Sequence, residues 1–219
     1  MTKPIVHGQP QSTYVRTARM ACIESGVDHE VRPIPAEGID GVRAHLHSDE
    51  YRRKHPFSRM PVLEDGDMTV FETSAICRYL TGRYGENRLV PADPCEAVRM
   101  EQWISALNSY VIPDTAFKYV LPIVFGGDAA AAEKMRPVLR AHYETLDAAL
   151  DGRDVIAGDD ISIADILMAP PLHLVGCMPG GTAFFDGLEN LGRWWTAISE
   201  RPSFKDTFAP LPQVSDRAA

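Results

Sequence analysis

The spacing of apolar residues changes near residue 84. Before that point, short strand-like runs alternate with helical runs; beyond it, apolar residues recur almost everywhere at the three- and four-residue spacing of helices. Residues 84–94, YGENRLVPADP, are rich in turn formers and separate the two patterns. We therefore expect a small α/β domain over residues 1–83, a linker over 84–94 and an all-helical domain over 95–219.

The first domain is predicted to have the element order β-α-β-α-β-β-α. Gly26 ends the first helical run, and a Gly-Asp turn joins PVLED to MTVF as a hairpin. The order combines a βαβ unit with a terminal hairpin. In chain order, the elements are PIVHG, TYVRTARMACIESG, VDHEVRPI, the polar stretch 40–54, PVLED, MTVF and SAICRYLTGRY.

The helical domain is predicted to contain four helical segments. We expect a kink or a break at Pro113 and Pro122, because proline lacks the N–H that a helix interior needs. The four segments are residues 95–125, residues 129–150 ending near Gly152, residues 161–176 and residues 188–199.

The third of these segments begins with the pattern of a capping box. Ser162 and Asp165 have the S-x-x-D spacing, and Ile161 with Ile166 fit the accompanying hydrophobic staple. We interpret this pattern as a folding device without a catalytic role. Asp165→Ala is expected to lower the free energy of unfolding by about 1 kcal/mol.

Charge is unevenly distributed along the chain. The net charge is −8; residues 1–88 contain 12 Lys/Arg and 12 Asp/Glu, whereas residues 89–219 contain 10 and 18. An acidic chain is a poor partner for nucleic acid. The neutral N-terminal part is therefore the better place for an anionic ligand.

Several other classes of protein are disfavoured by what the sequence lacks. No apolar run approaches the roughly 18 residues of a membrane span, and MTKPIVHGQP lacks a signal-peptide core, so we expect a cytoplasmic protein with no membrane partner. The four cysteines form no C-x-x-C pair and the seven histidines no H-x-x-x-H pair, so no metal site is expected. Phosphate-binding G-x-x-x-x-G-K-S/T and hydrolase G-x-S-x-G patterns are also missing.

Two features at the ends of predicted elements each have a structural and a functional interpretation. Pro61 is at the start of a predicted strand. In the functional interpretation, neighbouring peptide groups are left free to bind a ligand; in the structural one, Pro61 is an edge-strand proline and nothing more. Glu72-Thr73-Ser74 is at the start of a predicted helix. In the functional interpretation, the free N–H groups there bind an anion; in the structural one, the triplet caps the helix and nothing more.

The turn GQPQST between the first strand and the first helix contains the candidate catalytic hydroxyls. Ser12 could donate a hydrogen bond to a sulfur near the helix N-terminus and stabilise a thiolate. Alternatively, Ser12 is an ordinary N-cap, and Thr13 could serve either role equally well.

Three segments together resemble the cytosolic glutathione S-transferase family. HPFSRMPVLEDGDMTVFETSAICRYL resembles the family's NPFGxVPxLxDGDxxxFESxAIxxYL pattern, GQPQSTYVR resembles the turn of the serine-type classes, and SIADI resembles the capping box of the helical domain. The resemblance is to a phi- or theta-like bacterial class. It covers nearly the whole chain. Gly8 stands where the tyrosine-type classes have tyrosine, and no cysteine lies in the turn.

The resemblance implies a thioredoxin-like N-terminal domain that binds glutathione and a helical domain that lines a pocket for a hydrophobic electrophile. It further implies a cis Met60–Pro61 bond, a detoxification role and a homodimer in which Phe57 enters the neighbouring subunit, although Phe57 could instead pack within the monomer. Isomerisation, dehalogenation or peroxide reduction with glutathione, and a non-catalytic interaction protein, remain alternatives on the same fold.

The resemblance also implies roles for particular residues. Ser12 or Thr13 is expected to contact the thiol, the Met60 main chain the cysteinyl unit, and Glu72 with Thr73 the γ-glutamyl group. Arg59 and a histidine, His47 or His45, are expected near the glycine carboxylate. Tyr110, Phe117 and Met168 lie where family pocket residues occur, but aromatics at helical spacing also fit a core. The predicted glutathione-binding residues are Ser12, His47, Arg59, Met60, Pro61, Glu72 and Thr73.

Overall fold

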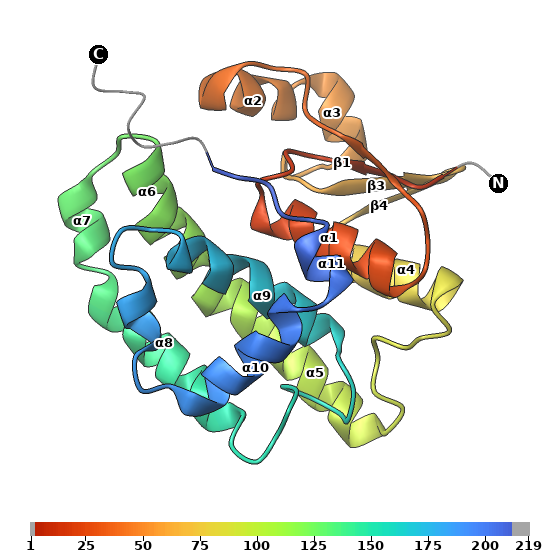
Figure 1. Cartoon of the computed structure of the whole chain (residues 1–219). Coiled ribbons are helices and arrows are strands. Elements are labelled where there is room, and N and C mark those ends of the chain that lie inside the picture. Colours follow the sequence, from red (N-terminus) through yellow and green to blue (C-terminus); the bar gives the residue numbers. More distant parts are fainter. Residues whose placement is uncertain (1–2, 212–219) are drawn as a thin grey trace.

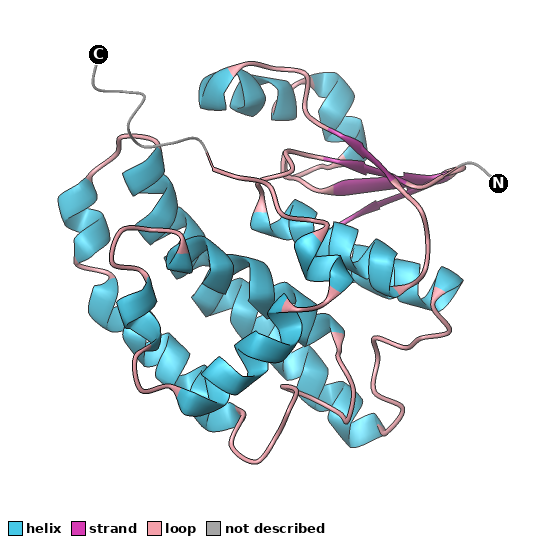
Figure 2. Ribbon diagram, viewed as in Figure 1, coloured by secondary structure: helices cyan, strands magenta, loops and turns pink. Residues whose placement is uncertain are grey.

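The computed structural model describes residues 3–211, which form a sheet-containing part and a helical part (Figures 1 and 2). Residues 1–2 and 212–219, the ends of the two predicted domains, lie outside the described residues. The sheet-containing part consists of β1 (Ile5–His7), α1 (Thr13–Glu24), β2 (Glu30–Arg32), α2 (Gly38–Leu46), α3 (Asp49–Lys54), β3 (Val62–Asp65), β4 (Met68–Phe71) and α4 (Thr73–Tyr84).

The four strands form one mixed sheet in the order β2-β1-β3-β4. β1 is parallel to β2 and antiparallel to β3, so that Val6 pairs with Val31 on one side and Leu63 on the other. α1 and α4 cover one face of the sheet, and α2 and α3 lie on the other (Figure 1). The predicted element order is confirmed, except that the stretch 40–54 forms two helices. Ser48 starts the second one by accepting a hydrogen bond from Tyr51 N at 3.2 Å.

The helical part begins with a long helical run that crosses both prolines. π-helical geometry occurs in two segments of this run. The elements are α5 (Pro94–Ala106), η1 (Leu107–Val111), η2 (Pro113–Val120), α6 (Leu121–Val124), α7 (Ala129–Glu133), α8 (Arg136–Ala149), α9 (Ile163–Gly176), η3 (Thr182–Phe185), α10 (Glu189–Ser199) and α11 (Pro202–Lys205).

A kink or a break was predicted at Pro113 and Pro122, and the structure contradicts the break, because helical segments adjoin one another across both prolines. Pro113 begins the π-helical segment η2, and Pro122 lies in α6 directly after that segment, so both prolines adjoin π-helical geometry. The π-helical segments change the hydrogen-bonding register around them, as insertions of this kind do inside α-helices. The helical run therefore continues from α5 to α6.

The prediction of a single helix over residues 129–150 is also wrong. α7 ends at Glu133 and α8 begins at Arg136, with Pro137 in its first turn. Pro137 cannot donate the main-chain hydrogen bond that a continuous helix requires from that position, so the helix starts again there.

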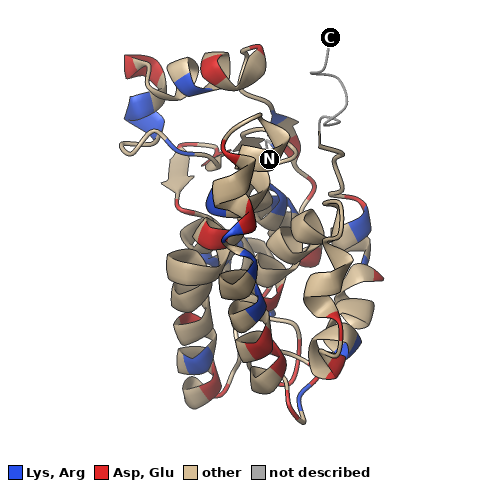
Figure 3. Cartoon of the chain, turned by 90° about the vertical axis from the view of Figure 1, so that its left-hand side faces the viewer, with Lys and Arg blue, Asp and Glu red and all other residues tan. Residues whose placement is uncertain are grey.

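The two parts share one apolar core. Its buried residues include Val6 and Leu63 from the sheet, Ala18 from α1 and Ile166 from α9. α1 packs directly against α4 and α9, which places the N-terminal end of α1 beside the helical part. Residues of both charge signs are interspersed along the helices on the face drawn in Figure 3. Within residues 3–211, no helix is long and apolar enough to cross a membrane.

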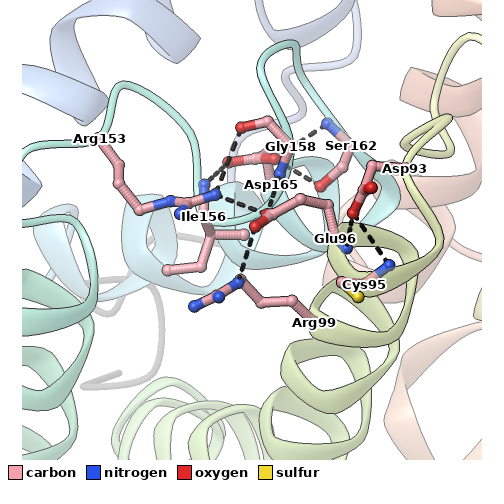
Figure 4. Close-up of polar contacts among 9 residues, drawn as sticks. All are labelled: Asp93, Cys95, Glu96, Arg99, Arg153, Ile156, Gly158, Ser162 and Asp165. Atoms are coloured by element: carbon pink, nitrogen blue, oxygen red, sulfur yellow. Dashed lines mark hydrogen bonds and ion pairs between the residues drawn. The ribbon is translucent and has the colours of Figure 1, made fainter.

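The start of α9 contains the predicted capping box, which is confirmed. Asp165 Oδ2 accepts hydrogen bonds from Ser162 N at 2.9 Å and from Ser162 Oγ at 2.6 Å. Asp165 Oδ1 accepts two more, from Ile156 N and Trp194 Nε1, both at 2.9 Å. Figure 4 shows how Asp165 joins the loop before α9 to the helix start. The fully buried Asp165 carboxylate therefore accepts four hydrogen bonds. It caps α9 and also connects the helix to Ile156 and Trp194, which lie outside it.

Candidate active site

The turn after β1 passes close to the loop before β3. Gly8 has a φ of 145°, and a Cβ placed on it would lie 2.4 Å from Val15 Cγ2 and 3.2 Å from Met60 Cβ. A larger residue would clash there, and glycine alone tolerates this φ readily. Gly8 thereby allows the GQPQST turn and Met60 to border the same space.

Ser12 is the N-cap of α1. Its Oγ accepts a hydrogen bond from Val15 N at 3.5 Å, which is long for such a bond. Because the cap uses only an oxygen lone pair, the hydroxyl proton remains available to a ligand. The structural and functional interpretations of Ser12 are therefore compatible.

The Met60–Pro61 peptide bond is cis, as the resemblance implied. The β3 ladder begins only at Val62, so the main chain of Met60 lies outside the sheet. Tyr51 Oη donates to Arg59 O at 3.0 Å, and Gln9 N donates to Met60 Sδ at 3.3 Å. These contacts hold the loop in place beside the GQPQST turn.

Glu72 precedes α4 with an unusual backbone conformation. Its φ is 69°, and its side chain makes no capping hydrogen bond to the helix. A positive φ at a residue other than glycine costs about 1–3 kcal/mol and persists only where the surroundings impose it. The carboxylate of Glu72 and the buried Thr73 after it both border the cavity described next.

One cavity of about 480 Å³ brings these features together. It lies between the sheet-containing part and the π-helical segments η1 and η2 of the helical part. Its walls combine polar groups with apolar ones, as ligand cavities of this size usually do. The lining residues are Ser12, Tyr14, Leu46, His55, Arg59, Met60, Pro61, Glu72, Thr73, Asn108, Pro113 and Phe117.

Two opposite charges act on the cavity. Burial raises the pKa of Tyr14 to about 12, with Glu72 raising it further and Arg59 lowering it. Burial lowers the pKa of His55, with Glu72 opposing that shift and Arg59 adding to it. Within residues 3–211, neither Glu72 nor Arg59 takes part in an ion pair. The cavity thus offers an unpaired carboxylate and an unpaired guanidinium, which suits a zwitterionic ligand with a second anionic group.

Most of the predicted glutathione-binding residues line this cavity, and two predicted residues do not. Thr13 is buried and lines a different cavity. His47 is the exposed C-cap of α2, beside the lining residue Leu46, and His45 is likewise not a lining residue. The predicted residues that the structure brings together are Ser12, Arg59, Met60, Pro61, Glu72 and Thr73.

The sequence reasoning missed five lining residues; Leu46, Asn108 and Pro113 are three of them, and the two with titratable side chains are Tyr14 and His55. His55 opens the segment HPFSRMP, so its place in the resembling pattern was a usable signal. It is 2% exposed, and its Nδ1 has no hydrogen-bond partner among residues 3–211. Tyr14 follows Ser12 by two residues and lies in the first turn of α1. No sequence signal showed which way its ring would face.

The helical part supplies the apolar wall of the cavity. Phe117 lines it together with Asn108 and Pro113. Tyr110 is 63% exposed and does not line the cavity, whereas Met168 lies in the fully buried core of α9. Of the three pocket residues considered from the sequence, Phe117 alone borders this cavity. No group of three or more His, Cys, Asp or Glu able to hold a metal occurs among residues 3–211.

Three features surround one cavity: a cis-proline loop, a charged helix start and a capping serine. The helical part closes this cavity. Together these features are typical of a thioredoxin-like transferase of the glutathione-binding class. Residues 6–88 match the family model "Glutathione S-transferase, N-terminal domain", and residues 106–202 match "Glutathione S-transferase, C-terminal domain". The chain therefore belongs to the glutathione S-transferase family.

Individual relatives agree with this assignment. Glutathione S-transferase 3 of Zea mays is 29% identical over 214 residues, which are 94% of each chain. The crystal structure of poplar glutathione transferase F1 is 25% identical, with a TM-score of 0.82 over 94% of this chain and 97% of that one. A glutathione S-transferase-I structure bound with lactoylglutathione is 25% identical, with a TM-score of 0.81 over 94% and 98%. The predicted fold, family and serine-type class, and the prediction of a transferase, are confirmed.

Proposed function

We propose that this glutathione transferase binds glutathione in the 480 Å³ cavity and promotes attack of its thiolate on a hydrophobic electrophile. The observation that supports this most directly is that Ser12, the cis-proline loop and the start of α4 all line one cavity. These three features come from segments up to about sixty residues apart, and neither a cap nor an edge-strand proline requires them to meet.

The proposed binding mode uses each part of the tripeptide. The Glu72 carboxylate pairs with the γ-glutamyl ammonium, while the Thr73 N–H and hydroxyl at the start of α4 bind the γ-glutamyl carboxylate. The Met60 main chain binds the cysteinyl unit as an added strand would. The Arg59 guanidinium binds the glycine carboxylate, and His47 remains a second proposed contact for that group.

The proposed chemistry is electrostatic. The Ser12 hydroxyl donates to the cysteinyl sulfur, and the N-terminus of α1 adds a favourable dipole. Both favour the thiolate over the thiol, and each pKa unit corresponds to about 1.4 kcal/mol. The thiolate then forms a bond to the electrophilic carbon as the leaving group departs with its electron pair. Ser12 forms no covalent bond in this scheme.

A homodimer in the cytoplasm, with a role in detoxification, is part of the same proposal. Phe57 lies in the loop between α3 and β3, with its ring centroid 6.5 Å from that of Phe71. It is nevertheless 71% exposed, which makes it accessible to a neighbouring subunit. An aromatic anchor that enters a pocket of its partner is typical of residues that dominate interface stability.

The test is conjugation of 1-chloro-2,4-dinitrobenzene, together with retention on immobilised glutathione. We expect retention and glutathione-dependent turnover. Retention without turnover would favour the isomerase, dehalogenase or peroxidase alternatives, which the corresponding substrates would then separate. Loss of both would favour a non-catalytic interaction protein.

A further inference from the structure

The helix α3 holds the loop that contains the cis-proline. α3 ends at Lys54, and the last three residues of the following segment 55–61 line the glutathione cavity. Tyr51 on α3 donates from its hydroxyl to Arg59 O at 3.0 Å, and its own carbonyl accepts from His55 N at 2.9 Å. The position of this loop therefore depends on how α3 is docked on the sheet.

Apolar packing under α3 is limited. α1 and α4 cover the other face of the sheet and contribute to the large core that is shared with the helical part (Figure 1). The face under α2 and α3 has a separate, smaller apolar cluster. Because apolar burial stabilises in proportion to the area removed from water, this cluster holds α3 less firmly than the large core holds α1. Its buried members are Ile34, Leu46, Tyr51 and Val62.

A polar contact adds to this packing. Glu64 on β3 uses both of its carboxylate oxygens: Oε2 accepts from His7 Nε2 at 2.5 Å, and Oε1 pairs with Lys54 Nζ at 2.9 Å. His7 and Glu64 are diagonal neighbours across the β1–β3 pair, because the residue opposite His7 is Val62. One carboxylate therefore connects β1, β3 and the end of α3.

This contact is shielded from water more than a typical surface ion pair. The side chains are 8% exposed for His7, 26% for Glu64 and 31% for Lys54. Burial alone would raise the pKa of Glu64, but hydrogen bonds from Lys54 and His7 hold it below its usual value. The carboxylate is thus ionised at neutral pH. Burial lowers the pKa of His7 more than Glu64 raises it, so a neutral imidazole donates from Nε2.

We propose that Glu64 is a positioning residue for glutathione. Through His7 and Lys54 it docks α3 on the sheet, and the docked helix holds the segment 59–61 in the arrangement that lines the cavity. Glu64 does not line the cavity itself, so it acts through this segment. The inference rests on the proposed function, in which the segment 59–61 binds glutathione.

The first test removes one arm of the contact. Lys54→Met changes a partly exposed side chain and should fold. Its KM for glutathione should rise at least about threefold, because the binding arrangement of the loop is then populated for only part of the time. Its kcat at saturating glutathione should stay within about twofold of the wild type, because Ser12 belongs to a different turn. Lys54→Arg keeps the cation and should restore the wild-type KM. An unchanged KM in Lys54→Met would overturn the proposal.

A double variant tests whether the residues act together. Glu64→Ala removes both arms and should raise the KM for glutathione at least as much as Lys54→Met. Combining the two changes should add nothing further, because residues that share one contact are not additive. Increases in KM that multiply in the double variant would contradict a common contact.

The helical part provides a matched control. Asp114 on η2 accepts from His142 Nε2 at 2.9 Å and pairs with Lys118 Nζ at 2.7 Å, which is the same combination of histidine, carboxylate and lysine. Lys118→Met should keep the KM for glutathione within about twofold of the wild type, since this contact joins η2 to α8 and not α3 to the sheet. A rise equal to that of Lys54→Met would show a general effect of lost charge and overturn the specific role.

Hydrogen exchange of the protein without glutathione measures the docking directly. Lys54→Met should speed amide exchange in the peptide 49–61 at least about threefold, because local opening of α3 becomes easier, and Lys118→Met should not. Wild-type exchange rates in Lys54→Met would overturn the docking. Faster exchange in a protein that does not bind glutathione would support the docking and contradict the proposed function.

Discussion

Ser12 and Thr13 are consecutive in the chain, and their side chains line two different cavities. Ser12 caps α1 and borders the glutathione cavity, whereas Thr13 is the first residue of the helix and is buried on the other cavity's wall. From the sequence, either hydroxyl could serve the thiol. The geometry at the start of α1 separates them, and it makes the pair a direct comparison for the proposed mechanism.

Ser12→Ala should lower kcat/KM for 1-chloro-2,4-dinitrobenzene about 10- to 100-fold, because it removes one charge-assisted hydrogen bond to the thiolate. The pKa of bound glutathione should rise, so the acid limb of the pH profile of kcat/KM should move to higher pH. Thr13→Ala is the matched control and should stay within about threefold of the wild type. A Ser12→Ala profile that superimposes on the wild type would show that this hydroxyl has no part in the chemistry.

Glu72→Gln should raise the KM for glutathione about tenfold and leave the acid limb of the pH profile in place, because it removes a charge opposite the ammonium and not the donor to the sulfur. Steady-state kinetics at varied glutathione provide the measurement. Glu50→Gln, at an exposed position on α3 away from the cavity, is the control. An unchanged KM in Glu72→Gln would exclude the proposed ammonium contact.

Asp165→Ala should lower the free energy of unfolding by about 3–5 kcal/mol, because it leaves buried donors without an acceptor and each of these costs about 1–3 kcal/mol. This exceeds the value of about 1 kcal/mol expected from the sequence, because the structure adds Ile156 N and Trp194 Nε1 to the cap and all the donors are buried. The exposed cap Asp93, which accepts from Cys95 N and Glu96 N, is the control (Figure 4). In urea melts, Asp93→Ala should cost only about 1 kcal/mol. Equal losses in the two variants would show that the tertiary donors of Asp165 add nothing.

Acid should destabilise the fold through His173. Its folded pKa is about 4, below the ordinary value of 6.5, because of burial and the adjacent Arg16. Between these two pH values the unfolded chain binds a proton that the folded chain does not, so the free energy of unfolding should decrease as pH falls from about 6.5 to 4. His173→Gln keeps an acceptor for Arg16 and should flatten this slope in urea melts, whereas His47→Gln at the surface should not. A slope equal to the wild type in His173→Gln would contradict the assignment.

Phe57→Ser should raise the dissociation constant of the proposed homodimer at least tenfold, as truncation of an interface anchor commonly does. Sedimentation equilibrium separates a dimer from the 24.2 kDa monomer. Val138→Ser, at an exposed apolar position on α8, is the control and should leave the dissociation constant unchanged. A wild-type protein that is monomeric at all concentrations tested would rule out the dimer.

Sequence reasoning succeeded where the signal is local. The hairpin PVLED–GD–MTVF, the capping box at Ser162 and the helix start within Glu72-Thr73-Ser74 depend on neighbouring residues, and each was placed correctly. It failed where two local rules competed. Pro113 was expected to kink or break a helix, and the helical run continues through it with π-helical geometry; Pro137, inside an otherwise regular pattern, divides one predicted helix into two.

The sequence by itself determined the two-part architecture, the resemblance to a glutathione transferase and most of the residues proposed to bind the tripeptide, because apolar periodicity and the spacing within each motif are encoded locally. Only the tertiary structure decided which side chains meet. The close approach of Gly8, Val15 and Met60 brings the serine turn to the cis-proline loop, and the direction of each side chain at the start of α1 sends Ser12 and Thr13 to different cavities. The tertiary structure also buries Arg16 without an ion pair to any carboxylate of residues 3–211, because its partners His173 and Phe204 come from α9 and α11, more than 150 residues away in the chain.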